Sequence, residues 1–231
     1  MNKMKYPQDF INKIICGDCL DVIKDIPDEV FIFSDPPYNQ KYHYDNYNDN
    51  LDEQEYRDLL YNIFVDRKSV IIHYPKETLQ ILATLDLGNL EQVVSWVYHS
   101  NTAKQHRLIT WWNCKPDMKK VGQDYKNPTD KRIKKRIANG EKARLYDWWE
   151  INQVKNVSKK NNSHSCPIPY KIADRIIKLT TKENDIILDP FCGSGTFLLA
   201  AKKNNRKYIG IEISPEYCKI ARQRLCQEVL L

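Results

Sequence analysis

Short apolar runs alternate with segments of helical periodicity through the first half of the chain. The runs are rich in β-branched and aromatic residues, and several end at a small or acidic residue. We predict strands at residues 11–16, 30–34, 69–73, 92–98 and 108–112, and helices at 20–26, 54–65 and 76–85. Between the second strand and the second helix, the tract after Asn39, residues 40–50, is dominated by Tyr, Asn and Asp without any period, which predicts a loop.

The same alternation returns near residue 169, after a segment with poor periodicity and few aliphatic residues. Here we predict helices at 169–179, 196–203 and 216–225, and strands at 185–188 and 207–211. Strands that alternate with helices are typical of an α/β fold: a mostly parallel, twisted sheet with helices on both faces.

The interrupting segment carries most of the positive charge. The chain has 231 residues and a net charge of +6, but residues 115–160 alone hold fourteen basic and six acidic side chains, a net charge of +8. The remainder is therefore slightly acidic. A basic segment of this kind indicates a polyanionic partner, although a solvated lysine-rich face has the same composition.

The composition excludes several classes of protein. Hydrophobic residues make up 42%, enough for a core and too many for a disordered chain. The longest stretches without charge, 92–103 and 190–201, are shorter than the roughly 18 residues of a membrane span. No secretory signal is visible, so we expect a cytoplasmic protein without membrane contact. The seven irregularly spaced cysteines indicate reduced thiols, and the histidines lack ligand spacing, so we expect no metal site.

A glycine-containing turn, residues 189–196 (DPFCGSGT), joins the predicted strand 185–188 to a helix. Glycines allow the backbone to approach a ligand, and the helix begins with N–H groups that lack partners. The spacing is neither that of a P-loop nor that of a dinucleotide-binding fingerprint. Glu212 ends the next strand, where an acid is suited to bind the two hydroxyls of a ribose. Together they predict a nucleoside site at the carboxyl ends of the strands.

A second unusual turn, Asp35-Pro36-Pro37-Tyr38, directly follows the strand 30–34. Consecutive prolines fix the backbone and remove its N–H donors, which leaves carbonyl acceptors. A carboxylate and a carbonyl accept hydrogen bonds only, so they suit a ligand with an amino group. An aromatic ring two residues on can stack on a base, worth about 1–3 kcal/mol.

These two turns resemble those of the amino-DNA methyltransferases, which methylate exocyclic amines with S-adenosylmethionine. The order, with Asp-Pro-Pro-Tyr first and a basic insertion before the glycine turn, resembles the β class of that family. The resemblance covers about residues 14–225 and implies a Rossmann-like fold. It also implies a catalytic part at 1–114, a basic target-recognition insertion at 115–163 and a cofactor-binding part at 164–231.

The resemblance implies catalytic roles for the first turn. Asp35 and the carbonyl of Pro36 would hold the target amine, and Tyr38, after Pro37, would stack on the flipped base. Hydrogen bonds from the amine would aim its lone pair at the methyl donor, a contribution of positioning and charge complementarity.

The resemblance also implies cofactor contacts. Glu212 would bind the ribose hydroxyls, and Asp18, beside Cys19, the adenine amine, with Asp35 close to the cofactor as well. Further cofactor contacts are expected in the glycine turn, at Asp189, Phe191, Gly193, Ser194, Gly195 and Thr196. Residues 162–167 fit the segment that leads into the first helix of the cofactor half.

The basic insertion is the expected surface for double-stranded DNA, with lysines contacting phosphates and arginines reading guanine. The expected contacts are Lys131, Arg132, Lys134, Lys135, Arg136 and Arg144, together with Tyr42 and Tyr44 of the loop after the catalytic turn. Because so short an insertion covers little DNA, a homodimer is a reasonable hypothesis. A cognate restriction endonuclease would be the partner in a restriction–modification system.

These observations predict an adenine-N6 DNA methyltransferase that acts by base flipping. Asp before Pro-Pro-Tyr favours adenine, and cytosine N4 is the alternative. An alternative enzyme class is methylation of RNA or of a protein amide. The non-enzyme hypothesis is a DNA-binding module that does not turn over the cofactor.

Overall fold

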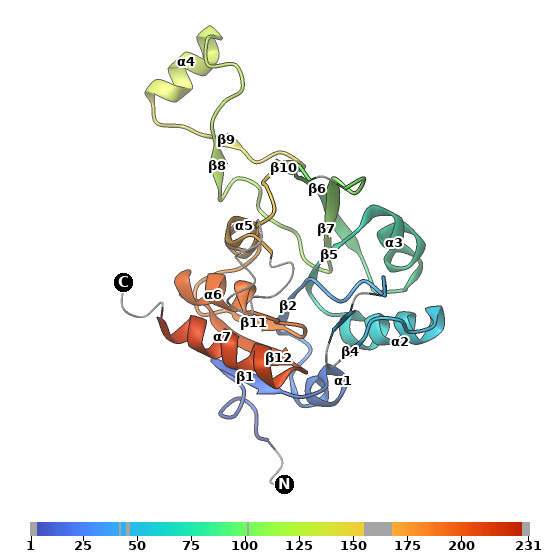
Figure 1. Cartoon of the computed structure of the whole chain (residues 1–231). Helices are drawn as coiled ribbons and strands as arrows, with labels where there is room; N and C mark the ends of the chain where they lie inside the picture. The colour runs from blue at the N-terminus through green and yellow to red at the C-terminus, as the bar shows by residue number, and fades with distance from the viewer. Residues whose placement is uncertain (1–3, 42, 45–46, 101, 155–167, 228–231) are drawn as a thin grey trace.

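The computed structural model describes residues 4–41, 43–44, 47–100, 102–154 and 168–227. A sheet of eight strands forms its centre, with helices on both faces (Figure 1). The strands are β1 (Lys13–Cys16), β2 (Phe31–Ser34), β5 (Ser69–His73), β6 (Leu90–Val97), β7 (His106–Trp112), β10 (Trp148–Glu150), β11 (Ile186–Asp189) and β12 (Lys207–Glu212). Their spatial order is β1-β12-β11-β2-β5-β7-β6-β10, and only β7 runs antiparallel to its neighbours. The predicted mostly parallel α/β sheet is confirmed.

Both faces of the central strands are buried, which explains their continuous apolar runs. Phe33 and Val70 belong to a core cluster with α5 (Tyr170–Thr180), α6 (Thr196–Lys203) and α7 (Pro215–Gln227). The alternate residues Ile32 and Ile71 face a second cluster, with residues of α1 (Cys19–Val22), η1 (Ile23–Asp25), α2 (Glu53–Phe64) and η2 (Leu82–Thr84). The short helix α3 (Pro75–Gln80) follows β5. Among the helices described, none has the length and apolar character needed to cross a membrane.

Helix α2 illustrates how local sequence fixes an element. Asp52 and Glu55 form a capping box at its start, so two backbone N–H groups of the first turn have partners. Its predicted apolar positions are all buried: Tyr56, Leu59, Leu60, Ile63 and Phe64.

The tract predicted as a loop contains a short hairpin, β3 (His43–Tyr44) and β4 (Tyr47–Asn48). Two-residue strands have no detectable period, which is why the pattern missed them. The carboxylate of Asp49 holds the two residues that follow the turn 35–38, because it accepts from the backbone N–H groups of Asn39 at 2.8 Å and Gln40 at 3.0 Å.

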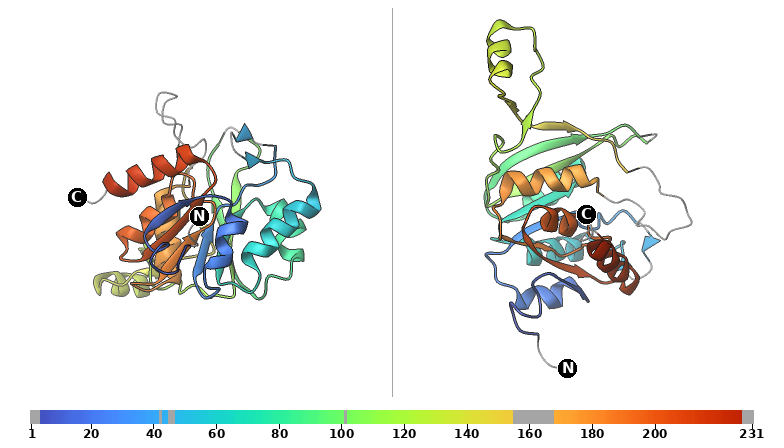
Figure 2. Two further views of the ribbon diagram at one scale, coloured as in Figure 1. Left: turned by 90° about the horizontal axis from the view of Figure 1, so that it is seen from below. Right: turned by 90° about the vertical axis from the view of Figure 1, so that its left-hand side faces the viewer.

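The basic segment projects from the body as an arm that consists of β8 (Gly122–Gln123), α4 (Lys131–Ala138) and β9 (Ala143–Arg144) (Figure 2). Asp130 begins α4 as its N-cap and accepts from the N–H groups of Arg132 and Ile133. Strand β10 also falls within the expected insertion, but it pairs with β6, and Trp149 is buried in the main core. The boundaries of the three expected parts stay a prediction.

Candidate active site

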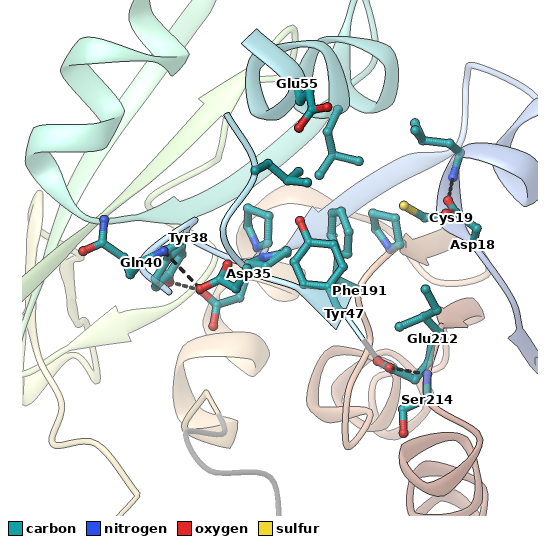
Figure 3. A pocket seen from close by; sticks show the side chains of 18 of the residues that line it. Asp18, Cys19, Asp35, Tyr38, Gln40, Tyr47, Glu55, Phe191, Glu212 and Ser214 are labelled. Carbon is teal, nitrogen blue, oxygen red and sulfur yellow. Dashed lines mark hydrogen bonds between the residues drawn. The ribbon is translucent and has the colours of Figure 1, made fainter. Parts of the chain in front are cut away.

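Four adjacent parallel strands, β1, β12, β11 and β2, end at the same edge of the sheet. Ligands of such sheets bind outside the carboxyl ends of the strands. Here Asp18, Asp35, Phe191 and Glu212, each from the end of a different strand, line one cavity of about 680 Å³ (Figure 3). The topology therefore unites motifs that are up to almost 200 residues apart in the sequence.

The cavity contains most of the residues expected to act. Those that line it are Asp18, Cys19, Asp35, Pro36, Pro37, Tyr38, Phe191 and Glu212. Five expected residues of the glycine turn are not among those that line it, namely Asp189, Gly193, Ser194, Gly195 and Thr196. The expected segment 162–167 lies outside the described residues. The individual roles of all these residues stay predictions.

Glu212 is held at the cavity wall by two backbone N–H groups. Its Oε2 accepts from Gly193 at 2.8 Å, and its Oε1 accepts from Ser214 at 2.9 Å. A carboxylate has about four acceptor positions, so acceptor capacity remains for hydroxyl donors of a ligand. Burial raises the pKa of Glu212, and hydrogen bonds from the backbone N–H groups of Ser214, Gly193 and Ile213 act in the opposite direction.

Asp18 and Cys19 follow β1 on the adjacent side of the cavity. Asp18 is the N-cap of α1 and accepts from the N–H of Leu20 at 2.8 Å, which fixes its carboxylate. Burial raises the pKa of the Cys19 thiol to about 12, so this cysteine is protonated and is not a nucleophile.

The glycine turn requires its glycines for backbone reasons. Gly195 begins α6 with φ +77°, a left-handed conformation that other residues adopt only with strain. Arg224 of α7 donates to the carbonyl and hydroxyl of Ser194, at 2.9 and 3.1 Å, and to the hydroxyl of Thr196 at 3.2 Å. These hydroxyls are thus engaged on the protein side of the turn.

The catalytic turn presents a carboxylate with two neighbours. The hydroxyl of Tyr38 donates to Asp35 Oδ1, and Arg107 Nη1 lies 3.5 Å from Asp35 Oδ2 (Figure 3 shows the first contact). Burial raises the pKa of Asp35, whereas the Arg107 cation and the Tyr38 hydrogen bond lower it. The Arg107 guanidinium also lies 5.1 Å from the centroid of the Tyr38 ring.

Sequence reasoning missed the residues that surround this turn. Arg107 is 3% exposed, and its guanidinium also lies over the rings of Tyr74 and Trp96, at 5.2 and 5.3 Å. His73, at the end of β5, has its ring 4.5 Å from that of Tyr38. The sequence signal that could have identified them is a basic residue, Arg107, and a histidine, His73, at the ends of otherwise apolar strands.

The cavity has an acidic lining. Six acids line it, Asp18, Asp35, Asp49, Glu55, Asp58 and Glu212, against two bases, Lys104 and Arg107. Such a lining favours a ligand with positive charge. In the described part of the chain, no group of three or more His, Cys, Asp or Glu side chains could hold a metal ion.

The residues expected to contact DNA lie mainly on the arm. None of the eight residues of α4 is buried, and Arg144 of β9 is exposed. Two arginines of α4 have acidic neighbours, since Arg132 lies 3.6 Å from Asp130 and Arg136 lies 4.0 Å from Glu141. Tyr42 lies outside the described residues, and only the backbone of Tyr44, in β3, is described.

Comparisons with known proteins agree on a family. The N6/N4 family profile described as DNA methylase matches residues 30–223. Type II methyltransferase M.BglII of Bacillus subtilis is 28% identical over 96% of this chain and 71% of its own length. DNA adenine methyltransferase YhdJ of Escherichia coli (strain K12) is 28% identical over 92% of this chain and 82% of its own length.

Two solved structures share the fold. The cytosine-N4-specific PvuII DNA methyltransferase superposes with a TM-score of 0.65 at 18% identity, over 91% of this chain and 85% of that chain. The complex of M1.HpyAVI with SAM has a TM-score of 0.61 at 22% identity, over 92% of this chain and 98% of that chain.

Proposed function

Since the chain belongs to the N6/N4 DNA methylase family, we propose that it transfers a methyl group from S-adenosylmethionine to the N6 amine of adenine in duplex DNA. The observation that carries the proposal is the single cavity that joins Asp35 and Tyr38 to Glu212 and Asp18. One side of the cavity offers acceptors for an amine, and the other offers acceptors for a nucleoside.

The lining fits S-adenosylmethionine. The acceptor capacity left on Glu212 suits a ribose diol, and Asp18 suits an adenine amine. The excess of acidic side chains suits a ligand that carries a sulfonium and an ammonium group. When bound, S-adenosylmethionine supplies an electrophilic methyl group.

The residues of the catalytic turn position the acceptor amine. Asp35 and the Pro36 carbonyl accept its two N–H groups, which fixes the nitrogen and turns its lone pair outward. The raised pKa of Asp35, caused by burial, suits a carboxylate that takes up a proton as the new N–C bond forms. Reaching this site requires the base to leave the helix, and the Tyr38 ring offers a surface on which it stacks.

The arm supplies the DNA-binding surface in this proposal. Helix α4 projects from the body with five basic residues among eight, which suits contacts to phosphates and to base edges (Figure 1). A second copy of the chain would extend this short footprint. A cognate restriction endonuclease is the partner expected of such a methyltransferase, because methylation protects the sites that the nuclease cuts.

Cytosine N4 is the second candidate. The carboxylate and the carbonyl accept any exocyclic amine, and the PvuII enzyme, which shares the fold, is cytosine-N4-specific. The test is transfer of a tritiated methyl group from S-adenosylmethionine to unmethylated duplex DNA, followed by nucleoside analysis. Label in N6-methyldeoxyadenosine supports the proposal, label in N4-methyldeoxycytidine replaces it with the second candidate, and unlabelled DNA of every sequence refutes both.

A further inference from the structure

Half of the four residues in the catalytic turn offer no backbone donor. Pro36 and Pro37 have no N–H, so donors from other elements help to fix the turn. One such donor is the hydroxyl of Tyr56 in α2, which lies 2.8 Å from the carbonyl oxygen of Pro37. Tyr56 is fully buried and is not among the residues that line the cavity. The Pro37 carbonyl therefore points into the protein.

The hydroxyl of Tyr56 is in turn oriented by His73 of β5. His73 Nε2 lies 2.8 Å from the Tyr56 hydroxyl, and the backbone N–H of Tyr74 donates to His73 Nδ1 at 2.9 Å. Because Nδ1 accepts a hydrogen bond, the proton of the neutral ring sits on Nε2. The direction of the chain follows: His73 Nε2–H donates to Tyr56, and the Tyr56 O–H donates to Pro37.

The surroundings of His73 keep its ring neutral. It is 1% exposed, and burial, with the Arg107 cation as a further cause, lowers its pKa to about 3. The same ring lies 4.5 Å from the ring of Tyr38, tilted by 45°. His73 thus supports the catalytic turn at two points, the Pro37 carbonyl through Tyr56 and the Tyr38 ring directly.

We propose that Tyr56 and His73 are positioning residues for methyl transfer, which turn the Pro37 carbonyl inward and leave Asp35 and the Pro36 carbonyl to receive the amine. This inference rests on the proposed function. Neither residue is among those that line the cavity, so both act through the turn. The expected cofactor contacts other than Asp35 follow β1, β11 and β12, whereas this chain of hydrogen bonds joins α2 and β5 to the end of the catalytic turn.

The first test is Tyr56→Phe, which removes only the hydroxyl. We expect kcat to fall by about tenfold or more, the effect of about one lost hydrogen bond on a barrier. Both the Kd for S-adenosylmethionine and the KM for DNA should change by less than about twofold, because their contacts lie elsewhere. The matched control is Tyr61→Phe on the same helix, whose side chain is 41% exposed and which should keep the wild-type kcat.

The second test concerns the donor on His73. His73→Gln retains an N–H donor and should keep more of kcat than His73→Leu, which has none. Nitrogen-15 NMR of the wild-type histidines should show His73, identified by its loss in His73→Gln, as a neutral ring with the proton on Nε2. This signal does not depend on activity.

The outcomes separate this inference from the proposed function. A wild-type protein that methylates no DNA refutes the proposed function, and the inference with it. An active wild type together with an unchanged kcat in Tyr56→Phe overturns the inference alone. A parallel loss of kcat and cofactor affinity in Tyr56→Phe also overturns it, because it indicates general disruption of the fold. Equal kcat values for His73→Gln and His73→Leu overturn it as well, and so does a His73 ring with its proton on Nδ1.

Discussion

Replacing Arg107 by Met is expected to move the acid limb of the pH–rate profile. Arg107 Nη1 lies 3.5 Å from Asp35 Oδ2, and the arginine side chain is 4% exposed. At that separation, with an effective dielectric constant near 20, the attraction is about 5 kcal/mol. Met keeps the length and most of the packing of the side chain but removes its charge.

The direction of this pH shift follows from the ionisation state in which Asp35 is active. Asp35 accepts hydrogen bonds as a carboxylate, so activity rises as the pH passes the pKa of this group. The Arg107 cation lowers that pKa, and its removal raises it, so the limb moves to higher pH. Even a third of the Coulomb energy corresponds to about one pH unit, because 1.4 kcal/mol is about one pKa unit.

The assay is kcat/KM for methyl transfer to duplex DNA from about pH 5 to about pH 9, which reports the ionisations of the free enzyme. Arg107→Lys retains the cation and should move the limb less than Arg107→Met does. The matched control is Arg175→Met in α5, where the guanidinium lies 5.5 Å from the Trp149 ring. An acid limb at the wild-type pH in Arg107→Met would refute the assigned role of Arg107.

Three further predictions test other parts of the site. Glu212→Gln keeps the shape but loses the charge, and calorimetry should show S-adenosylmethionine affinity lower by about tenfold or more, with DNA binding unchanged. Asp189 is 2% exposed and burial raises its pKa, so Asp189→Asn should raise the thermal midpoint at pH 8 by about 2–4 °C. That gain should shrink as the pH falls, because the wild-type carboxyl then binds its proton. On α4, we would change Lys131, Lys134 and Lys135 to Ala. This triple variant should reduce the slope of log K for DNA binding against the logarithm of the salt concentration by up to about 3.

Each of these three predictions has an outcome that contradicts it. Equal cofactor affinity in Glu212→Gln would remove Glu212 from the ribose site, and a gain independent of pH in Asp189→Asn would exclude relief of a buried charge. For the arm, the control changes three exposed lysines of the cofactor half, Lys182, Lys207 and Lys219. A salt slope that falls in the control and not in the α4 variant would place the DNA surface elsewhere.

Much of the fold could be predicted from the sequence because its elements are long enough to show a period. The apolar spacing of α2 identified all of its buried residues, and the apolar run at 69–73 predicted the strand β5, whose residues are all buried in the structure. The two motif turns indicated the family, which the comparison confirms. Helix α4 was not predicted, because its apolar stripe consists of only two isoleucines, Ile133 and Ile137, among basic residues, and none of its residues is buried.

The surroundings of the catalytic turn depend on strand order, which periodicity does not report. The connection between β6 and β7, residues 98–105, is shorter than the roughly dozen residues of a crossover, so the sequence is consistent with an antiparallel pair. It does not show which of the two strands lies beside β5. In the structure β7 inserts between β5 and β6, and Leu108 pairs with His73. The first residues of β7 therefore meet the last residues of β5, and Arg107 comes to lie beside the carboxylate that ends β2.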